Sequence, residues 1–301
     1  MAVKIQKVTL IGVGKMGSQI AARAAAFGNS VHLFDTNKEA LEHTTNIIEY
    51  ELKGYFQYGH VKCSAEESMG RISFHENLSD ALIHTDLVIE SVPEDLDLKK
   101  QLITTLDKIA EKHTIIATNS SSIPASDLEN VVVRKDKVLN IHFYAPVLRT
   151  PMVDIMRGTL TSEETFLKAK QWIARIGCIP LIVKKPRMGF VFNHIWHSIM
   201  REALTTWARG YADYNDIDRA WMIWSDMPAG PFGMMDYVGL DIVYDIEMTY
   251  YRASNDPNDK PPDELKKMID KGELGLKSGK GFYDWRNPEF LKPEFLQPHN
   301  A

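Results

Sequence analysis

Residues 7 to 28, KVTLIGVGKMGSQIAARAAAFG, combine a short apolar run, a glycine-rich turn and an alanine-rich stretch. The apolar run predicts a buried strand, and the alanine-rich stretch predicts a helix that ends at Gly28. Between them, Gly12 makes the tight turn, Gly14 leaves room for a pyrophosphate to approach the backbone, and Gly17 allows close packing of helix on strand. Free N–H groups at the start of such a helix attract anions, so this stretch predicts a nucleotide-binding turn. The alternative is a glycine-rich turn without a ligand.

The second predicted strand, SVHLFD, ends in Asp35, which follows Gly17 by 18 residues (35 minus 17). A carboxylate at this place accepts hydrogen bonds from the two ribose hydroxyls of a dinucleotide and repels a 2′-phosphate. The pattern therefore favours NAD over NADP as the cofactor. Met16, inside the turn, is predicted to contact the cofactor together with the three glycines.

Strand and helix patterns alternate from residue 5 to about residue 184, which is typical of a mostly parallel sheet with helices on both faces. Inserted at about residues 37–70 are two polar, amphipathic helices with one apolar stripe, formed by Ile47, Ile48, Leu52 and Phe56. The predicted strands are KVTLI, SVHLFD, DLVIESV, TIIATNSSS, VLNIHF, MVDIM and CIPLIVK.

The pattern changes at KKPRMG, where Pro186 and Gly189 mark a junction. Long helical stretches follow, rich in Trp and Met, and no convincing strand is found among them. We therefore predict a Rossmann-type, doubly wound α/β domain in residues 1–186 and an all-α C-terminal domain in residues 187–301. The Trp and Met residues of the second domain are typical of a core or a subunit interface.

The composition excludes several classes of protein. With a net charge of -5 and no long basic block, the chain has no pattern for binding nucleic acid. Cys63 and Cys178 belong to no metal-binding spacing, so we expect no disulfide and no metal site, and a reducing cytoplasmic location. No apolar stretch approaches 18 residues, and the N-terminus shows no secretion signal, so we expect no membrane partner.

Seven motifs, in this order, resemble the L-3-hydroxyacyl-CoA dehydrogenase family: GVGKMGSQIA, DLVIESVPEDLDLKK, ATNSSSI, IHFYAP, GFVFNH, GPFGMMDYVGLD and GLKSGKGFYDW. The resemblance covers nearly the whole chain. The resemblance extends to relatives with the same fold that use substrates without CoA, namely L-gulonate and carnitine dehydrogenases and diketoreductases. VPEDLDLKK and TNSSSIPASDL look closer to that second group.

The resemblance implies roles for particular residues. His142 falls on the catalytic histidine of the family, and Asp154 falls on its partner, which is normally glutamate. Ser121 matches the serine that hydrogen-bonds the reacting oxygen near the cofactor, and Asn193 matches an asparagine that helps to bind substrate. Ala145 departs from the family, which usually has asparagine there. Two further residues match positions near the nicotinamide ribose, Glu94 and Lys99.

These residue types suit the oxidation of a secondary alcohol. Histidine titrates near neutral pH, so it can take the hydroxyl proton and return it in reduction. A carboxylate on its other ring nitrogen stabilises the imidazolium, and fixed dipoles from serine and asparagine can stabilise charge on the oxygen. Hydride transfer itself is the chemistry of the cofactor.

Each assignment has an alternative. His142 could be a core histidine, and Asp154 could pair with Arg149 or Arg157. Because aspartate is one methylene shorter than glutamate, its strand must approach by about 1.5 Å, or a water must bridge the gap.

The serine and asparagine assignments also have alternatives. Ser121 lies in a run of three serines, in which Ser122 could cap a helix and Ser120 could stabilise a turn. Asn193 could simply cap or tie the helix that follows the junction.

Three functions remain open from the sequence. The first is an NAD-dependent dehydrogenase of short L-3-hydroxyacyl-CoA in fatty acid metabolism, with the insertion at 37–70 holding the CoA end by resemblance. The second has the same chemistry on a free 3-hydroxy acid or a β-keto or diketo ester, with Arg149 as a carboxylate anchor. The third is a catalytically silent NAD-binding protein of crystallin type. By resemblance, the helical domain is expected to form a homodimer.

Overall fold

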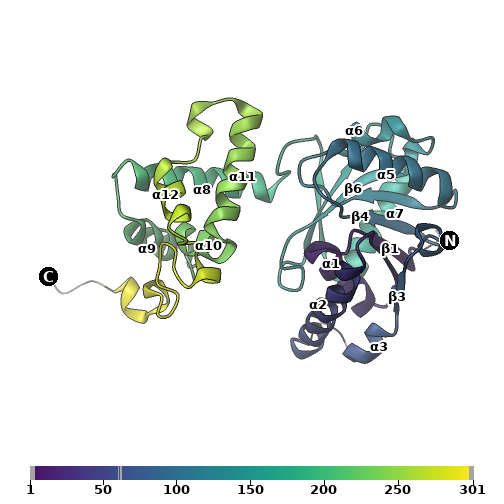
Figure 1. Cartoon of the computed structure of the whole chain (residues 1–301), viewed down its shortest axis with the longest axis horizontal. Coiled ribbons are helices and arrows are strands. Elements are labelled where there is room, and N and C mark those ends of the chain that lie inside the picture. The colour runs from purple at the N-terminus through teal and green to yellow at the C-terminus, as the bar shows by residue number, and fades with distance from the viewer. Residues whose placement is uncertain (1–3, 60, 62, 298–301) are drawn as a thin grey trace. The chain divides into compact units, whose positions relative to one another are not determined.

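The computed structural model describes residues 4–59, 61 and 63–297. The chain divides into two compact units, one ending at Val191 and the other beginning at Phe192 (Figure 1). The predicted domain boundary after residue 186 lies in the segment that connects the last strand of the first unit to the first helix of the second.

The first unit is built on an eight-stranded sheet with the order β3-β2-β1-β4-β5-β6-β7-β8. Seven strands match the predicted ones, but β3 was not predicted. The six strands from β3 to β6 are parallel, whereas β7 runs antiparallel to β6 and parallel to β8. The strands are β1 (Lys7–Ile11), β2 (Ser30–Phe34), β3 (Ile72–His75), β4 (Leu87–Glu90), β5 (Ile115–Thr118), β6 (Val138–Phe143), β7 (Met152–Arg157) and β8 (Ile179–Val183).

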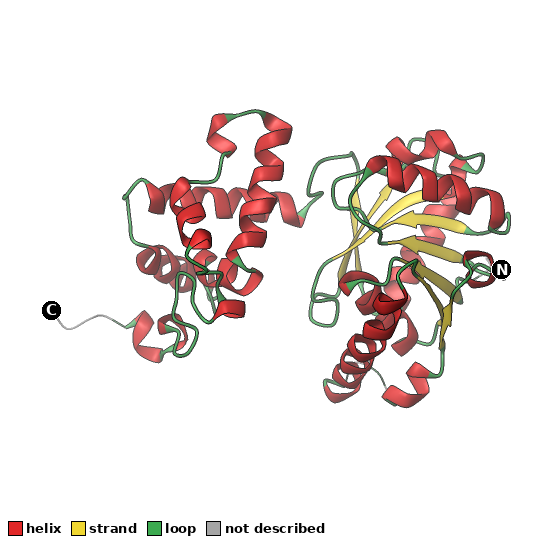
Figure 2. Cartoon of the chain, viewed as in Figure 1, coloured by secondary structure: helices red, strands yellow, loops and turns green. Residues whose placement is uncertain are grey.

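Helices cover both faces of this sheet, as Figure 2 shows for the red helices on either side of the yellow strands. One face packs on α1, α2 and α7 through a core that includes Ile20, Leu52 and Trp172. The other face packs on α4, α5 and α6, with Ile103 and Leu128 in its core. The predicted fold class, a Rossmann-type doubly wound sheet, is therefore confirmed. The helices are α1 (Lys15–Ala26), α2 (Lys38–Gln57), α3 (Ala65–Met69), α4 (Leu78–Ala81), α5 (Leu96–Ile109), α6 (Ala125–Leu128) and α7 (Glu163–Arg175).

The insertion between β2 and β3 contains the two predicted helices, α2 and α3. Its apolar stripe was predicted incorrectly at one end, because Phe56 is 55% exposed. Tyr55, one residue earlier, is fully buried instead, beside the buried Ile48 and Leu52. A helix turns by 100° per residue, so a shift of one position moves a side chain well around the helix.

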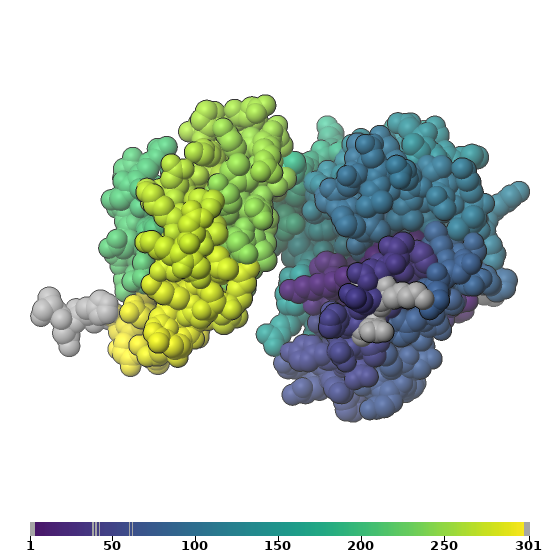
Figure 3. Space-filling view, in the orientation of Figure 1, coloured from purple at the N-terminus to yellow at the C-terminus, as the bar shows by residue number. Residues whose placement is uncertain are grey.

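The second unit is helical. Within the part of the chain that the structure describes, it has only isolated β-bridges and no strand, as the sequence predicts. Its core includes Phe232, Met235 and Leu265, and in Figure 3 the yellow C-terminal part of the chain spreads over one face of this unit. No helix of the described chain is long and apolar enough to cross a membrane. The helices are α8 (Phe192–Ala208), α9 (Tyr214–Ser225), α10 (Pro231–Val238), α11 (Leu240–Ser254) and α12 (Asp263–Asp270).

Candidate active site

The glycine turn lies at the carboxyl end of β1, and its three glycines meet different surroundings. A Cβ atom on Gly17 would lie 2.0 Å from the Gly12 carbonyl oxygen, and one on Gly12 would lie 2.7 Å from the Ser91 backbone. Gly12 also has a φ of +84°, which disfavours any side chain. A Cβ on Gly14 would meet nothing within 4 Å. Gly14 is also the N-cap of α1 and provides no side-chain cap, so the open space faces free N–H groups. These features fit a bound pyrophosphate.

Asp35 is held at the end of β2 by two backbone N–H groups. Val13 N donates to Asp35 Oδ2 and Asn37 N donates to Asp35 Oδ1, both at 2.9 Å. Each carboxylate oxygen keeps a further lone pair, so the residue can still accept from ribose hydroxyls. Met16 is partly buried and packs against the core behind the turn.

Lys99, which matches a position near the nicotinamide ribose, is buried beside Glu94. Its side chain is 1% exposed, and its ammonium donates to both carboxylate oxygens of Glu90, at 2.9 Å each, and to the Val92 carbonyl. It also lies 3.4 Å from a carboxylate oxygen of Glu94. The geometry therefore makes Lys99 a support for Glu94. Glu90 was missed from the sequence, where it reads only as the last residue of an apolar strand.

The run of three serines surrounds Glu94. The hydroxyls of Ser120 and Ser122 both donate to Glu94 Oε1. Burial would raise the pKa of Glu94, but these hydrogen bonds and the charge of Lys99 outweigh it, so the pKa lies below its usual value. Ser120 also accepts from the backbone N–H of Ile123, so its predicted turn role is confirmed.

Ser122 does not cap a helix, because the N-cap of α6 is Pro124. That alternative was wrong. The side chain of Ser121, between the two serines that bind Glu94, makes no hydrogen bond within the described residues. Its hydroxyl is therefore available to another molecule.

His142 and Asp154 lie directly opposite each other in the antiparallel pair of β6 and β7. His142 Nδ1 donates to Asp154 Oδ2 at 3.2 Å, so the shorter aspartate reaches the ring without a bridging water. His142 is 6% exposed and Asp154 is fully buried. The Nε2 atom of the ring makes no hydrogen bond within the described chain. One ring nitrogen is thus bound by a carboxylate and the other is left for a reacting group.

The alternative partners of Asp154 are engaged elsewhere. Arg157 pairs with Glu163. Arg149 donates to the Tyr58 hydroxyl at 3.3 Å, and its guanidinium lies 5.9 Å from the centre of the Tyr58 ring. Both alternative pairings were therefore wrong. Arg149 itself is exposed and directed towards the end of α2.

Two aromatic rings enclose the imidazole. Tyr144 meets it edge-on at 4.7 Å between ring centres, and Phe190 does so at 5.4 Å. The Tyr144 hydroxyl also donates to Asp154 Oδ2, the oxygen that His142 uses. The sequence offered one signal for this contact. Tyr144 lies two residues after His142, and side chains two apart point to the same side of an extended chain.

The parallel strands bring these groups to one edge of the sheet. The glycine turn, the Glu94 cluster, Ser121 and His142 follow or end strands β1, β4, β5 and β6, whose carboxyl ends coincide. Phe143 N donates to Asn119 Oδ1 at 2.9 Å and ties the last two strands together there. Ligands bind at this edge in doubly wound sheets. Asn193 belongs to the other unit, as the second residue of α8, and is half-buried.

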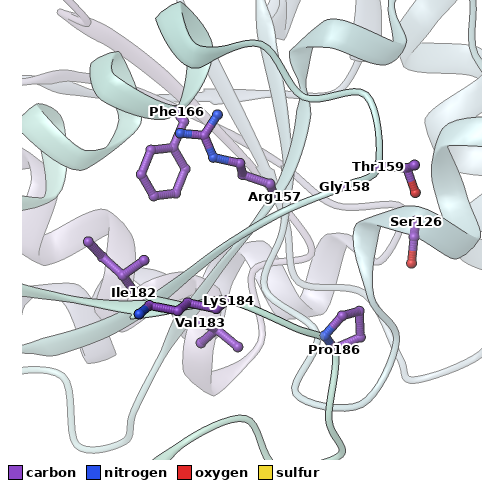
Figure 4. A pocket seen from close by; sticks show the side chains of 9 residues that line it. All are labelled: Ser126, Arg157, Gly158, Thr159, Phe166, Ile182, Val183, Lys184 and Pro186. Carbon is purple, nitrogen blue, oxygen red and sulfur yellow. The ribbon is translucent and has the colours of Figure 1, made fainter.

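A cavity of about 420 Å³ lies elsewhere in the first unit (Figure 4). Arg157, over the ring of Phe166, and Lys184 line it, and none of the predicted site residues does. The cationic group of Arg157 is already paired with Glu163. The cavity therefore adds nothing to the chemistry at the carboxyl edge.

A doubly wound sheet with an open glycine turn, followed by a helical unit, is an architecture of dinucleotide-dependent dehydrogenases. Residues 7–186 match the NAD-binding domain of 3-hydroxyacyl-CoA dehydrogenase, and residues 189–285 match the C-terminal domain of the same enzyme. The chain therefore belongs to the 3-hydroxyacyl-CoA dehydrogenase family. It is an NAD-dependent oxidoreductase that acts on CH–OH groups, and the predictions of family and cofactor are confirmed.

Relatives of both substrate types are similar to this chain. A probable 3-hydroxybutyryl-CoA dehydrogenase of Bacillus subtilis (strain 168) is 33% identical over 283 residues, which cover 94% of this chain and 98% of the relative. A solved diketoreductase, described as acting on dicarbonyl compounds, is 35% identical with a TM-score of 0.85, over 93% of this chain and 99% of that one. The crystal structure of (S)-3-hydroxybutyryl-CoA dehydrogenase from Ralstonia eutropha is 29% identical with a TM-score of 0.83, over the same shares of each chain.

Proposed function

We propose that this protein interconverts a 3-hydroxyacyl group and its 3-keto form, with His142 as the acid–base residue. The observation that carries the proposal is the buried pair of His142 and Asp154, whose Nδ1–Oδ2 distance is 3.2 Å and whose Nε2 atom remains available. The pair lies at the same edge of the sheet as the open glycine turn. A core histidine with both nitrogens engaged would not support this role.

Each residue has one task in this mechanism. His142 Nε2 takes the hydroxyl proton of the alcohol, and Asp154 stabilises the imidazolium through Nδ1. The hydroxyl of Ser121 donates to the substrate oxygen. A role of Asn193 in binding substrate rests on the family resemblance alone. When bound, NAD accepts the hydride from the carbon.

The cofactor residues prepare this reaction without taking part in it. Gly12, Gly14 and Gly17 shape the turn for the pyrophosphate, with Met16 behind it, and Asp35 binds the adenosine ribose. The proposed role of Glu94, which accepts hydrogen bonds from Ser120 and Ser122, is to accept a hydrogen bond from a hydroxyl of the nicotinamide ribose. The buried ammonium of Lys99 lies 3.4 Å from a carboxylate oxygen of Glu94 and helps to hold that side chain in position.

The substrate that we propose first is a short 3-hydroxyacyl-CoA, because relatives with that name cover nearly the whole chain. A free 3-hydroxy acid or a β-keto or diketo ester is the second candidate, which the 35% identity to a diketoreductase favours. Arg149 was predicted to anchor a free carboxylate. Since it is directed towards Tyr58, it must turn away from that ring to do so. A silent, crystallin-like protein is the least supported function, because the complete set of Ser121, His142 and Asn193 is present.

A substrate panel tests this proposal. NADH oxidation is followed with acetoacetyl-CoA, free acetoacetate and ethyl acetoacetate, in the wild type and in His142→Ala. We expect turnover of acetoacetyl-CoA in the wild type and a loss of at least about 100-fold in the variant, with NADH binding retained. His113→Ala, which removes an exposed histidine just before β5, is the matched control. Full activity of His142→Ala would refute the acid–base role, and turnover of the free substrates alone would refute the CoA substrate.

Two predictions about the whole protein remain predictions. Homodimerisation through the helical unit rests on the family resemblance and on its exposed apolar side chains, such as Trp224 at 84% and Tyr237 at 50% exposure. A cytoplasmic location rests on the two unpaired cysteines, Cys63 and Cys178.

A further inference from the structure

Asp154 receives both of its hydrogen bonds on one oxygen atom. His142 Nδ1 and the Tyr144 hydroxyl donate to Oδ2, whereas Oδ1 is buried and has no hydrogen-bond partner within the described residues. The residue is 0% exposed, so bulk solvent does not reach the carboxylate. Among the described residues, the two donors to this carboxylate are thus His142 and Tyr144, and Tyr144 is the one that is not itself the acid–base residue.

We infer that Tyr144 is a positioning residue of the acid–base pair, which holds Asp154 against His142 and limits how strongly the carboxylate retains the proton of the imidazolium. The inference rests on the proposed function of His142 and Asp154, and it concerns a residue that the family resemblance does not assign. Tyr144 touches neither substrate nor cofactor in this role, and it keeps its own proton throughout.

The geometry explains why an aspartate at this position benefits from a second donor. Its short side chain has few rotamers that reach the ring across the two strands, and a hydroxyl bound to the same oxygen selects one of them. Tyr144 is itself fixed, because it is 6% exposed and its ring packs edge-on against the imidazole. Its backbone carbonyl also accepts from the Thr150 hydroxyl at 2.8 Å, which holds the segment after β6 in place.

Tyr144 also has an electrostatic consequence. A buried carboxylate with one donor fewer is a stronger base and attracts a proton to the pair more strongly. We therefore expect that removing the Tyr144 hydroxyl strengthens the attraction between Asp154 and the imidazolium of His142.

Tyr144→Phe tests the inference, because it removes only the hydroxyl. We measure the titration of the His142 ring by NMR, with the signal assigned among the ten histidines by its loss in His142→Ala. The expected result is a titration midpoint about one pH unit higher than in the wild type. In NADH-dependent reduction of the substrate that the panel identifies, the midpoint of the pH–rate profile should rise with it, and kcat should fall about threefold to tenfold. Tyr211→Phe, at a side chain that is 75% exposed, is the control and should change neither.

A second background separates a hydrogen bond from general packing. In Asp154→Asn there is no carboxylate charge for the hydroxyl to stabilise, so adding Tyr144→Phe should leave the midpoint where Asp154→Asn alone puts it. An unchanged midpoint in Tyr144→Phe, or an equal shift in both backgrounds, would overturn the inference. The NMR titration does not require turnover. An active His142→Ala would therefore sink the proposed function, whereas an inactive His142→Ala with an unshifted Tyr144→Phe titration would sink only the role of Tyr144.

Discussion

Lys99 shows how the partner of a residue decides its role. The sequence motif places it near the nicotinamide ribose, but its ammonium is buried between Glu90 and Glu94. The Thr118 hydroxyl also donates to Glu90, so the buried carboxylate has several donors. A lysine so enclosed neutralises a buried charge.

Lys99→Met is accordingly expected to lower stability more than it lowers cofactor binding. It leaves Glu90 buried without a cation, which costs about 3–5 kcal/mol when one partner of a buried pair is removed. Urea unfolding followed by circular dichroism measures the loss. Lys108→Met, at an exposed lysine of the same helix, is the control and should cost under about 1 kcal/mol. Adding Glu90→Gln should recover part of the loss, and no recovery would argue against charge burial as its cause.

The sequence singled out His142 and Asp154 as a pair but could not supply their contacts. His142 and Asp154 come together because β6 and β7 pair in one register, which the twelve-residue spacing alone does not fix. Tyr144 escaped notice for the same reason, since its contact with Asp154 depends on that register. Glu90 was overlooked because a buried acid at a strand end is indistinguishable in sequence from an exposed one.

At the scale of elements, the glycines of the turn between β1 and α1 are required for different structural reasons, although they look alike in sequence. Gly17 is required by the protein itself, because a Cβ there would lie 2.0 Å from the Gly12 carbonyl oxygen. Gly14 has a φ of -61° and open space around its missing Cβ, so the folded chain alone does not require glycine there. A pyrophosphate bound against this backbone would require glycine at position 14.

Alanine at these two positions should therefore separate folding from binding. We expect Gly17→Ala to lower the free energy of unfolding by about 2–4 kcal/mol, because helix and turn must move apart. Gly14→Ala should change stability by under about 1 kcal/mol but weaken NADH binding at least about tenfold. Urea unfolding and NADH fluorescence measure the two effects. A Gly14→Ala variant that binds NADH normally would show that the cofactor does not approach this backbone.

Most elements were predictable because their periodicity is strong, and the exceptions have physical causes. The β3 strand has four residues with the sequence ISFH and no fully buried side chain, so it lacks the apolar run that marks the central strands. It is an edge strand, paired with β2 alone. The α2 stripe was misplaced at Phe56 because Tyr55 and Phe56 are both large and aromatic, and only packing decides which of them faces the core.

At the scale of the whole molecule, each unit has buried ionisable groups whose pKa values are shifted, and two of these shifts have opposite directions. In the helical unit, burial raises the pKa of Asp218 to about 6, although the N–H groups of Phe232 and Gly233 that bind it act in the opposite direction. Burial likewise raises the pKa of Asp236. In the sheet unit, burial first and the nearby charge of Lys7 second lower the pKa of His32. Acid should therefore affect the two units differently.

Whether a group stabilises the fold at low or at high pH depends on whether the folded or the unfolded chain binds its proton more tightly. Asp218 has a higher pKa in the folded chain, about 6 against 3.8, so its stabilising contribution is complete below about pH 3.8 and is lost as the pH rises through 6. A histidine whose pKa is lowered in the folded chain, such as His32, has the opposite effect. Its contribution to stability is present above its unfolded pKa and is lost as the pH falls through its folded pKa. Between pH 7 and pH 5 the helical unit should gain stability from Asp218 while the sheet unit loses some from His32.

Tryptophan fluorescence can follow the helical unit selectively, because five of the six tryptophans lie in it and only Trp172 lies in the sheet unit. We expect the free energy of unfolding from urea curves to be about 1 kcal/mol higher at pH 5 than at pH 7 through Asp218 alone. Asp218→Asn cannot titrate and should lose that difference, even if it is less stable at both pH values. Asp213→Asn, at the start of the same helix, is the matched control and should keep the difference. If the helical unit were more stable at pH 7 in the wild type, or if Asp218→Asn kept the full pH dependence, the buried carboxylate would not be its source.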